Sequence, residues 1–245
     1  MRLGNIILVF AIALGVAFLI GLGSWQMHRL NWKEGLIERV KTNLSAPGKT
    51  VEEIKTMIAD GADIEYRPTA VGGTFLHHLE AHYFATHKGK PGYFIYTPLV
   101  QSSGQIIIVN RGYVPLEMKS AQDRQAGLTQ GVVQIEGLAR SAPAAKPNAF
   151  VPDNDLSKNI FYWKSLDQMI SNSDGELNGD KVDRFFIDAG ASDDPSTWPR
   201  GGVTRIEFPN NHLQYALTWF GLAGALLVVG GYFVVSRWRN TKHHS

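Results

Sequence analysis

Two apolar runs, one near each end of the chain, enclose a long polar middle region. No charged residue occurs from Leu3 to Gln26, and no Asp, Glu, Lys or Arg occurs from Phe208 to Ser236. A helix rises about 1.5 Å per residue, so roughly 20 apolar residues cross the hydrocarbon core of a bilayer. The pattern therefore predicts two transmembrane helices, at residues 1–26 and 208–236, with an extramembrane domain at residues 27–207.

Each apolar run also has another interpretation. The first is compatible with a cleaved signal peptide, with residues 21–23 as the small-residue cleavage site, but it is longer than usual and continues into a helical pattern at residues 29–41. The second is compatible with a buried core helix, but Trp219 and Tyr232 near its ends are typical of anchors at a membrane interface. We predict a membrane span in both cases.

The basic residues predict the orientation of the two spans. Two spans place both chain ends on one side of the membrane, and cytoplasmic flanks are enriched in Lys and Arg. The basic residues that mark this side are Arg2, Arg237, Arg239 and Lys242. Other basic residues begin the middle region, but connections longer than about 60 residues largely escape the rule. We expect both termini, including a basic tail at residues 237–245, in the cytoplasm and the middle domain in the periplasm.

The middle region combines short helices with a series of strands. Thr50 and Glu53 have the spacing of a capping box and predict a short helix that ends near Gly61. A second short helix is expected at residues 165–170. Runs rich in β-branched and aromatic residues predict strands at residues 67–75, 82–86, 93–100, 105–113, 132–138, 185–188 and 204–208. The expected fold class is a membrane protein in which two transmembrane helices flank one β-rich (α+β) domain, a small barrel or a curved antiparallel sheet.

Composition excludes several classes of function. A net charge of +2 with 19% charged residues argues against a dedicated nucleic-acid-binding protein. The chain has no cysteine, which excludes disulfides, thiolate metal sites and a thiol pair for carrying copper. The sequence has no glycine-rich phosphate loop, nucleophile elbow or paired-carboxylate pattern, so we expect no enzymatic activity.

Several segments, in this order and spacing, resemble the Surf1 family over nearly the whole chain. They are Gly23-Ser24-Trp25-Gln26, Glu65-Tyr66-Arg67-Pro68, Val71-Gly72-Gly73-Thr74-Phe75, Pro91-Gly92-Tyr93, Asn110-Arg111-Gly112-Tyr113-Val114-Pro115, Gly137-Leu138-Ala139-Arg140, Phe150-Val151-Pro152-Asp153-Asn154-Asp155, Phe161-Tyr162-Trp163, Phe186-Ile187-Asp188-Ala189 and Asn211-His212-Leu213-Gln214-Tyr215-Ala216-Leu217-Thr218-Trp219-Phe220-Gly221. One departure is Lys164, where the resemblance leads us to expect an acidic residue.

The resemblance implies an assembly factor for a haem–copper terminal oxidase, cytochrome c oxidase, in the bacterial inner membrane. It implies transient binding of haem a and insertion into oxidase subunit I, with haem a synthase as a further candidate partner and the lipid bilayer as the surroundings. The alternative is a haem-free scaffold that stabilises an early oxidase intermediate. Without the resemblance, a membrane-anchored periplasmic receptor domain also fits the pattern.

His212 is the strongest candidate for a ligand of haem iron. It lies at the outer mouth of the second apolar run, and imidazole is a common axial ligand. Tyr215 and Trp219 follow at helical spacing, so all three are expected on one helix face, where the aromatic rings could pack on a macrocycle. The alternative is a histidine that only anchors the helix at the interface.

Further candidates for haem binding lie at the end of the first apolar run. Trp25, Gln26, His28 and Arg29 are expected at the same depth as His212, with His28 as a second axial ligand and Arg29 as a partner for a propionate. The alternative is an interfacial belt of aromatic and cationic side chains. Arg111 in the middle domain is a further propionate candidate, although it could simply hold a turn next to Gly112.

The sequence contains two further groups of residues with functional potential, one of histidines and one of small residues. His77, His78, His82 and His87 lie close in sequence, but a strand would send His77 and His78 to opposite faces, so a metal site is not expected. Small residues on the apolar runs, namely Gly15, Gly21, Gly23, Gly221, Gly224 and Ala225, permit close helix approach within the chain, between chains or with an oxidase subunit.

Overall fold

The structure is a computed structural model that describes residues 3–192, 194 and 196–242, so Arg2 and the last three residues of the expected tail lie outside it. The chain divides into two compact units. One unit contains the terminal helices up to Arg39 and from Glu207 onward, and the other is a β-domain, Val40–Ile206. Each unit has its own internal contacts and is described separately.

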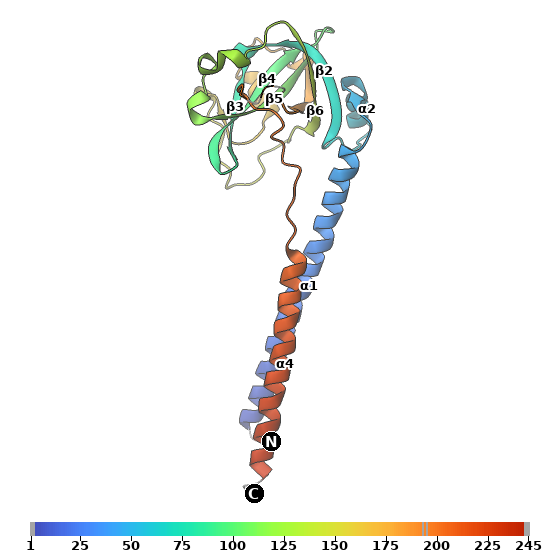
Figure 1. Ribbon diagram of the computed structural model, residues 1–245, viewed down its shortest axis with the longest axis vertical. Helices are drawn as coiled ribbons and strands as arrows, with labels where there is room; N and C mark the ends of the chain where they lie inside the picture. Colours follow the sequence, from blue (N-terminus) through green and yellow to red (C-terminus); the bar gives the residue numbers. More distant parts are fainter. Residues whose placement is uncertain (1–2, 193, 195, 243–245) are drawn as a thin grey trace. The chain divides into compact units, whose positions relative to one another are not determined.

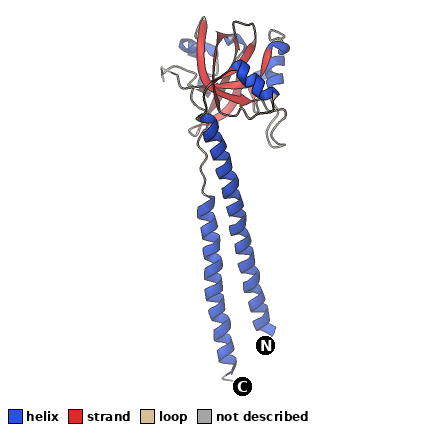
Figure 2. Cartoon of the chain, turned by 90° about the vertical axis from the view of Figure 1, so that its right-hand side faces the viewer, coloured by secondary structure: helices blue, strands red, loops and turns tan. Residues whose placement is uncertain are grey.

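The first unit is a pair of antiparallel helices. Helix α1 (Leu3–Leu44) and helix α4 (His212–Lys242) run side by side in both views (Figures 1 and 2). Both contain stretches long and apolar enough to cross a membrane. The helix expected at residues 29–41 is confirmed as part of α1, which continues without a break beyond the apolar run.

The contact between the two helices follows a heptad spacing. On α4, small buried residues recur every seven positions, at Ala216, Ala223 and Gly230. Half-buried side chains alternate with them, at His212, Trp219 and Leu226. This alternation of four- and three-residue steps keeps one stripe of a helix against its partner. We call this stripe, together with the residues of α1 that pack against it, the seam. His212 is therefore part of the seam.

Glycines on the seam let large side chains of the opposite helix pack closely. A β-carbon added at Gly15 would lie 3.0 Å from Leu226, and one added at Gly230 would lie 2.9 Å from Ile12. The predicted close approach is therefore found at Gly15. It is also found at Gly23, which packs against Phe220. Gly21, Gly221 and Gly224 have nothing within 4 Å of an added β-carbon, because they face away from the seam.

Replacing Gly23 by leucine is expected to destabilise the helix pair by about 1–3 kcal/mol, the usual cost of overpacking a well-fitted contact. An added β-carbon at Gly23 would lie 2.5 Å from the ring of Phe220. The matched control is Gly21→Leu, half a turn away, where the space is open. Thermal unfolding in detergent should show a lower Tm for Gly23→Leu than for Gly21→Leu. Equal values would contradict this account of the contact.

The second unit is built on one mixed sheet of eight strands that closes on itself. The strands are β1 (Lys49–Thr50), β2 (Arg67–Phe75), β3 (Ala81–His87), β4 (Lys90–Val100), β5 (Ile106–Pro115), β6 (Val132–Ser141), β7 (Ile160–Phe161) and β8 (Val182–Ala189). The order is β1-β2-β6-β8-β5-β4-β3-β7, and an additional pairing of β2 with β4 closes five of the strands into a barrel. The predicted small barrel is confirmed. Its sheet is mixed, because β5 and β8 pair in parallel.

The short helices cover the barrel. They are α2 (Val51–Ala59) and α3 (Leu166–Ser171), with 3-10 turns η1 (His77–Leu79), η2 (Leu116–Met118), η3 (Ala121–Gly127), η4 (Leu156–Lys158) and η5 (Gly179–Lys181). The capping box is confirmed, since Glu53 N–H donates to the Thr50 hydroxyl and the Glu53 carboxylate accepts from the Thr50 N–H. The second expected helix is confirmed as α3, which begins after Ser165.

Strand β5 explains how the hydrophobic core is divided. Ile107 and Val109 lie in one buried cluster with Leu99 of β4 and Ile54 of α2. Ile106 and Ile108 lie in a second cluster, together with residues of α3. Successive side chains of a strand point to opposite faces, so a strand covered on both faces is apolar at every position. This explains the unbroken Ile-Ile-Ile-Val run in the sequence.

Two sequence predictions for this domain are wrong. Residues 204–208 form no strand, although their apolar and polar side chains alternate. Their anchoring is through side chains, as Thr204 donates to the Asp188 carboxylate at 3.0 Å. His77 and His78 lie in the 3-10 turn η1 and not in a strand. The predicted strands at residues 93–100 and 105–113 are confirmed as parts of β4 and β5, and the turn that joins them is closed by the bond from Gln101 N–H to Gln105 C=O.

Candidate functional site

His212 and Gln26 meet across the seam of the helix pair. His212 is the first residue of α4, and its Nδ1 lies 2.7 Å from Oε1 of Gln26 on α1. Both side chains are half-buried. The other ring nitrogen of His212, Nε2, has no hydrogen-bond partner among the residues that the structure describes. An unpartnered imidazole nitrogen at the end of a helix pair is suited to binding a metal ion.

Aromatic side chains lie on both helices within two turns of this pair. Trp219 follows His212 by seven residues on the seam, and Tyr215 lies beside the seam with 55% of its surface exposed. Trp25 on α1 is equally exposed. Of the three residues that were expected on one helix face, His212 and Trp219 lie on the seam and Tyr215 lies at its edge.

Helix geometry predicts that Arg29 and Tyr215 lie on the same side of the helix pair. Each follows a member of the His212–Gln26 pair by three residues, and an antiparallel pair has an approximate twofold axis that places equivalent positions on one side. The guanidinium of Arg29 lies 4.5 Å from the ring centre of Trp32, which holds the arginine against α1 and leaves it exposed. The side of the seam with Tyr215 therefore carries a positive charge.

His28 is not brought to His212. It follows Gln26 by two residues, about 200° around the helix, and is exposed. Its ring therefore lies on the face of α1 away from the seam. A pair of axial ligands from His28 and His212 on one iron would need a rearrangement of α1.

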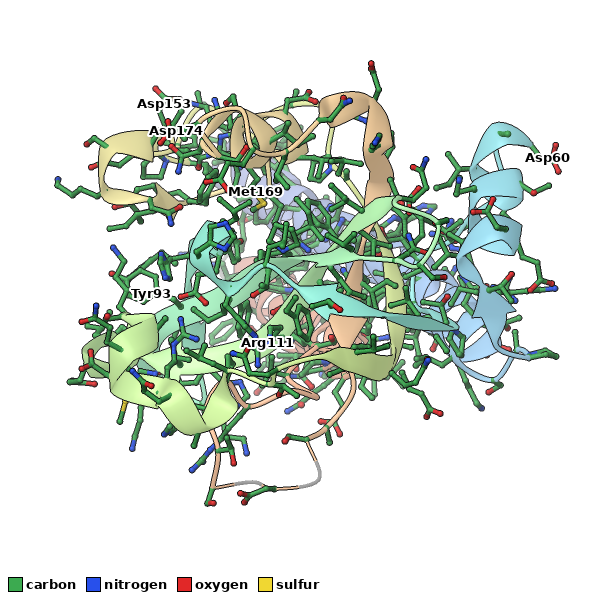
Figure 3. The ribbon with its side chains drawn as sticks, turned by 90° about the horizontal axis from the view of Figure 1, so that it is seen from above. Asp60, Tyr93, Arg111, Asp153, Met169 and Asp174 are labelled. Atoms are coloured by element: carbon green, nitrogen blue, oxygen red, sulfur yellow. The ribbon has the colours of Figure 1, made fainter. Side chains whose placement is uncertain are left out.

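Arg111 has contacts within the β-domain that account for its position (Figure 3). Its guanidinium donates to the Gly127 carbonyl, contacts His77 Nδ1 at 3.3 Å and lies 4.8 Å from the ring centre of Phe75. Burial, followed by the charge of nearby Arg124, lowers the pKa of Arg111 to about 10. Burial also lowers the pKa of His77. These contacts support a structural role for Arg111, although Gly112 lies inside strand β5 and not in the expected turn.

A buried ionic cluster includes His82, one of the four histidines that lie close in sequence. The Arg124 guanidinium pairs with the Glu80 carboxylate, which also contacts His82 at 3.2 Å. His78 instead contacts Glu176. Within the described residues, no group of three or more His, Cys, Asp and Glu side chains is arranged to hold a metal ion. We call the Glu80–His82–Arg124 group the buried ionic cluster.

Comparison with known proteins gives the family. Residues 13–224 match the model of the SURF1 family. A SURF1-like protein of Monosiga brevicollis is 35% identical over 222 residues, which cover 85% of this chain and 80% of the relative. Surfeit locus protein 1 of Homo sapiens is 31% identical over 225 residues, 84% of this chain and 70% of the relative. A SURF1-like protein of Rickettsia felis is 29% identical over 222 residues, with 86% and 89% covered.

The chain belongs to the SURF1 family. The resemblance in the sequence is thereby confirmed, and with it the coarser functional expectation of a role in cytochrome c oxidase assembly. The matched region contains the first seam residues of α1, the whole β-domain and the start of α4 with His212.

Sequence reasoning missed several polar contacts of this SURF1 chain. The buried ionic cluster was missed because Arg124 lies in an irregular 3-10 segment without a recognisable pattern. The bond between His212 and Gln26 joins residues 186 positions apart, and only the helix register brings them together. The signal available in the sequence was the occurrence of two polar residues at the edges of otherwise apolar runs.

Proposed function

We propose that this SURF1-family protein binds haem a at the His212 end of the helix pair and passes it to subunit I of cytochrome c oxidase. The observation that carries the proposal is a half-buried histidine whose Nδ1 is bonded to Gln26 and whose Nε2 has no partner among the described residues. Haem a, when bound, would supply an iron that takes a nitrogen ligand, and it also carries two carboxylates and an apolar tail.

The residues around His212 fit the other parts of such a molecule. Tyr215, Trp219 and Trp25 offer aromatic faces, and Tyr215 and Trp25 are exposed. Arg29 offers a guanidinium whose geometry matches a carboxylate. The apolar surfaces of α1 and α4 offer an environment for an apolar tail. Within this proposal His212 ligates the iron and Arg29 binds a propionate.

Delivery requires that the protein release what it binds. A single neutral imidazole is a weaker ligand set than two, and an exposed rim allows the oxidase to reach the same molecule. His28 on the far face of α1 cannot join His212 without rearrangement. One axial histidine is therefore part of the proposal, because it favours transfer over permanent retention.

The proposal also includes the membrane in which the protein lies and its orientation there. We place the two apolar helices across the bacterial inner membrane, with both termini in the cytoplasm and the β-domain in the periplasm. Two candidate spans and the basic residues that follow the second span support this orientation. The β-domain then provides the surface that docks on the oxidase.

The test is the visible absorption spectrum of the detergent-purified full chain, co-expressed with haem a synthesis. We expect a reduced haem a band in the wild-type protein and its loss or displacement in His212→Ala. His28→Ala is the matched comparison at the same depth on the other face, and its band should remain.

Each other outcome has a definite meaning. A colourless wild-type protein that co-purifies with oxidase subunits would favour the haem-free scaffold. An unchanged band in His212→Ala, with loss in His28→Ala, would move the ligand to the far face of α1. An unchanged band in both variants would place haem elsewhere and contradict the proposed site.

A further inference from the structure

The hydrogen bond between His212 and Gln26 has a direction that sets the chemistry of the imidazole. The Gln26 atom that faces the ring is the amide oxygen, 2.7 Å from Nδ1. An amide oxygen only accepts hydrogen bonds, so Nδ1 of His212 must carry the proton. In a neutral ring the lone pair then lies on Nε2, the nitrogen that has no partner within the described part of the chain.

We propose that Gln26 is a positioning residue that fixes His212 in the tautomer able to bind iron. A neutral histidine without such a partner favours the opposite tautomer, in which Nε2 carries the proton and cannot ligate a metal. The hydrogen bond made by one ring nitrogen decides the state of the other. The consequence for haem rests on the proposed function, but the tautomer is a property of the protein alone.

The helix register holds Gln26 in place for this role. Gln26 lies three residues beyond Gly23, which packs on Phe220, and the seam contacts at Gly15 and Gly230 continue the same register. Both side chains are half-buried between two helices, where a hydrogen bond is stronger than in water. Gln26 is therefore aimed at His212 by the packing of small residues along the seam.

The chemical nature of Gln26 also suits a carrier. Histidines that hold metals permanently often donate to a carboxylate, which raises the basicity of the ligand nitrogen. A neutral amide oxygen orients the ring with a smaller effect on its basicity. The choice of glutamine at residue 26 therefore combines a defined tautomer with a ligand weak enough to release its iron.

The first experiment measures the tautomer without haem. The full-length chain is labelled with ¹⁵N-histidine, placed in lipid nanodiscs and examined by NMR at about two pH units above the ordinary imidazole pKa of about 6.5, with His212→Ala to assign the signals. We expect Nδ1 of His212 to be protonated in the wild type. Gln26→Leu should convert the ring mainly to the Nε2-protonated form, and Gln26→Glu, which keeps an acceptor, should retain the wild-type form.

The control is Gln214→Leu, an exposed glutamine on α4 that lies off the seam and should leave the tautomer unchanged. Protonation of Nε2 in the wild type would overturn the inference. An unchanged tautomer in Gln26→Leu would overturn it as well. Because the Gln26→Glu variant restores an acceptor at the same place, a general disruption of the helix pair is distinguishable from loss of the hydrogen bond.

The second experiment connects the tautomer to haem. In protein loaded with haem a, Gln26→Leu should weaken retention by about 10- to 100-fold, the usual effect of removing a partner of a metal ligand. Resonance Raman spectra should show a lower iron–histidine stretching frequency in Gln26→Leu and a higher one in Gln26→Glu. Unchanged retention despite a changed tautomer would overturn the positioning role. A wild-type protein that binds no haem would instead contradict the proposed function and leave the tautomer result standing.

Discussion

Gly112→Ala is expected to destabilise the β-domain by more than about 3 kcal/mol, since backbone strain alone costs about 1–3 kcal/mol at such a position. Gly112 has a φ of +123°, which residues with a side chain rarely adopt. A β-carbon there would also overlap the backbone of Arg200 and Gly201. Relief of this overlap would break the two backbone hydrogen bonds between Tyr113 and Arg200, each 2.9 Å long.

Chemical unfolding of the full chain in detergent, followed by tryptophan fluorescence, measures this effect. Trp198 packs against Tyr113 and reports on the segment that would be displaced. The matched control is Gly89→Ala, which has a φ of +79° but nothing within 4 Å of an added β-carbon. Its cost should be limited to about 1–2 kcal/mol of conformational strain. Equal destabilisation of the two variants would show that the approach of Arg200 to Gly112 is not a structural requirement.

The helix pair and most strands could be predicted from the sequence because their signals are local. The apolar runs, the capping box at Thr50 and the hairpin turn at residues 101–104 depend on residues close in sequence. The parallel pairing of β5 with β8 has no such signal, since both strands are apolar and either direction would bury them. Residues 204–208 alternate like a strand but pair with none of the strands in the described part of the chain.

The candidate site was predictable in its members but not in its contacts. The sequence points to His212 because imidazole is a common ligand of haem iron, to Arg29 because a guanidinium matches a propionate, and to Gln26 because it is expected at the same depth. The sequence predicts His28 and His212 at one depth. The helix register, however, turns His28 to the face of α1 away from the seam. A shift of one or two positions around a helix decides which side chains meet, and only the packing at Gly15, Gly23 and Gly230 fixes that register.

Arg124→Met is expected to destabilise the β-domain by about 3–5 kcal/mol, the usual cost of removing one partner of a buried ion pair. The side chain of Arg124 is 0% exposed and that of Glu80 is 6% exposed. Arg124 also donates to the Met118 carbonyl at 3.1 Å, so the substitution removes a link between η3 and η2 as well. The remaining Glu80 carboxylate would be buried without a cation.

Unfolding at neutral pH tests this expectation against Arg184→Met. Arg184 pairs with Asp167 at 2.8 Å, but both side chains are more than half exposed. Exposed pairs contribute less than about 1 kcal/mol, so this control should unfold almost as the wild type does. A small effect of Arg124→Met would mean that the buried ionic cluster does not stabilise the domain.

The pH dependence separates the charge of Glu80 from the packing of Arg124. Burial raises the pKa of Glu80, but the hydrogen bond from His82 and the charge of Arg124 lower it further, so the pKa lies below its ordinary value of 4.5. The ionised carboxylate therefore stabilises the wild-type fold above pH 4.5, and this contribution is lost as the pH falls through the lowered pKa. In Arg124→Met the carboxylate keeps its contact with His82 but loses the charge of Arg124, so its burial costs stability most at neutral pH. The difference in unfolding free energy between wild type and Arg124→Met should hence shrink as the pH falls below 4.5, and Glu80→Gln combined with Arg124→Met should recover part of the loss at neutral pH. A difference that stays constant with pH would assign the effect to packing alone.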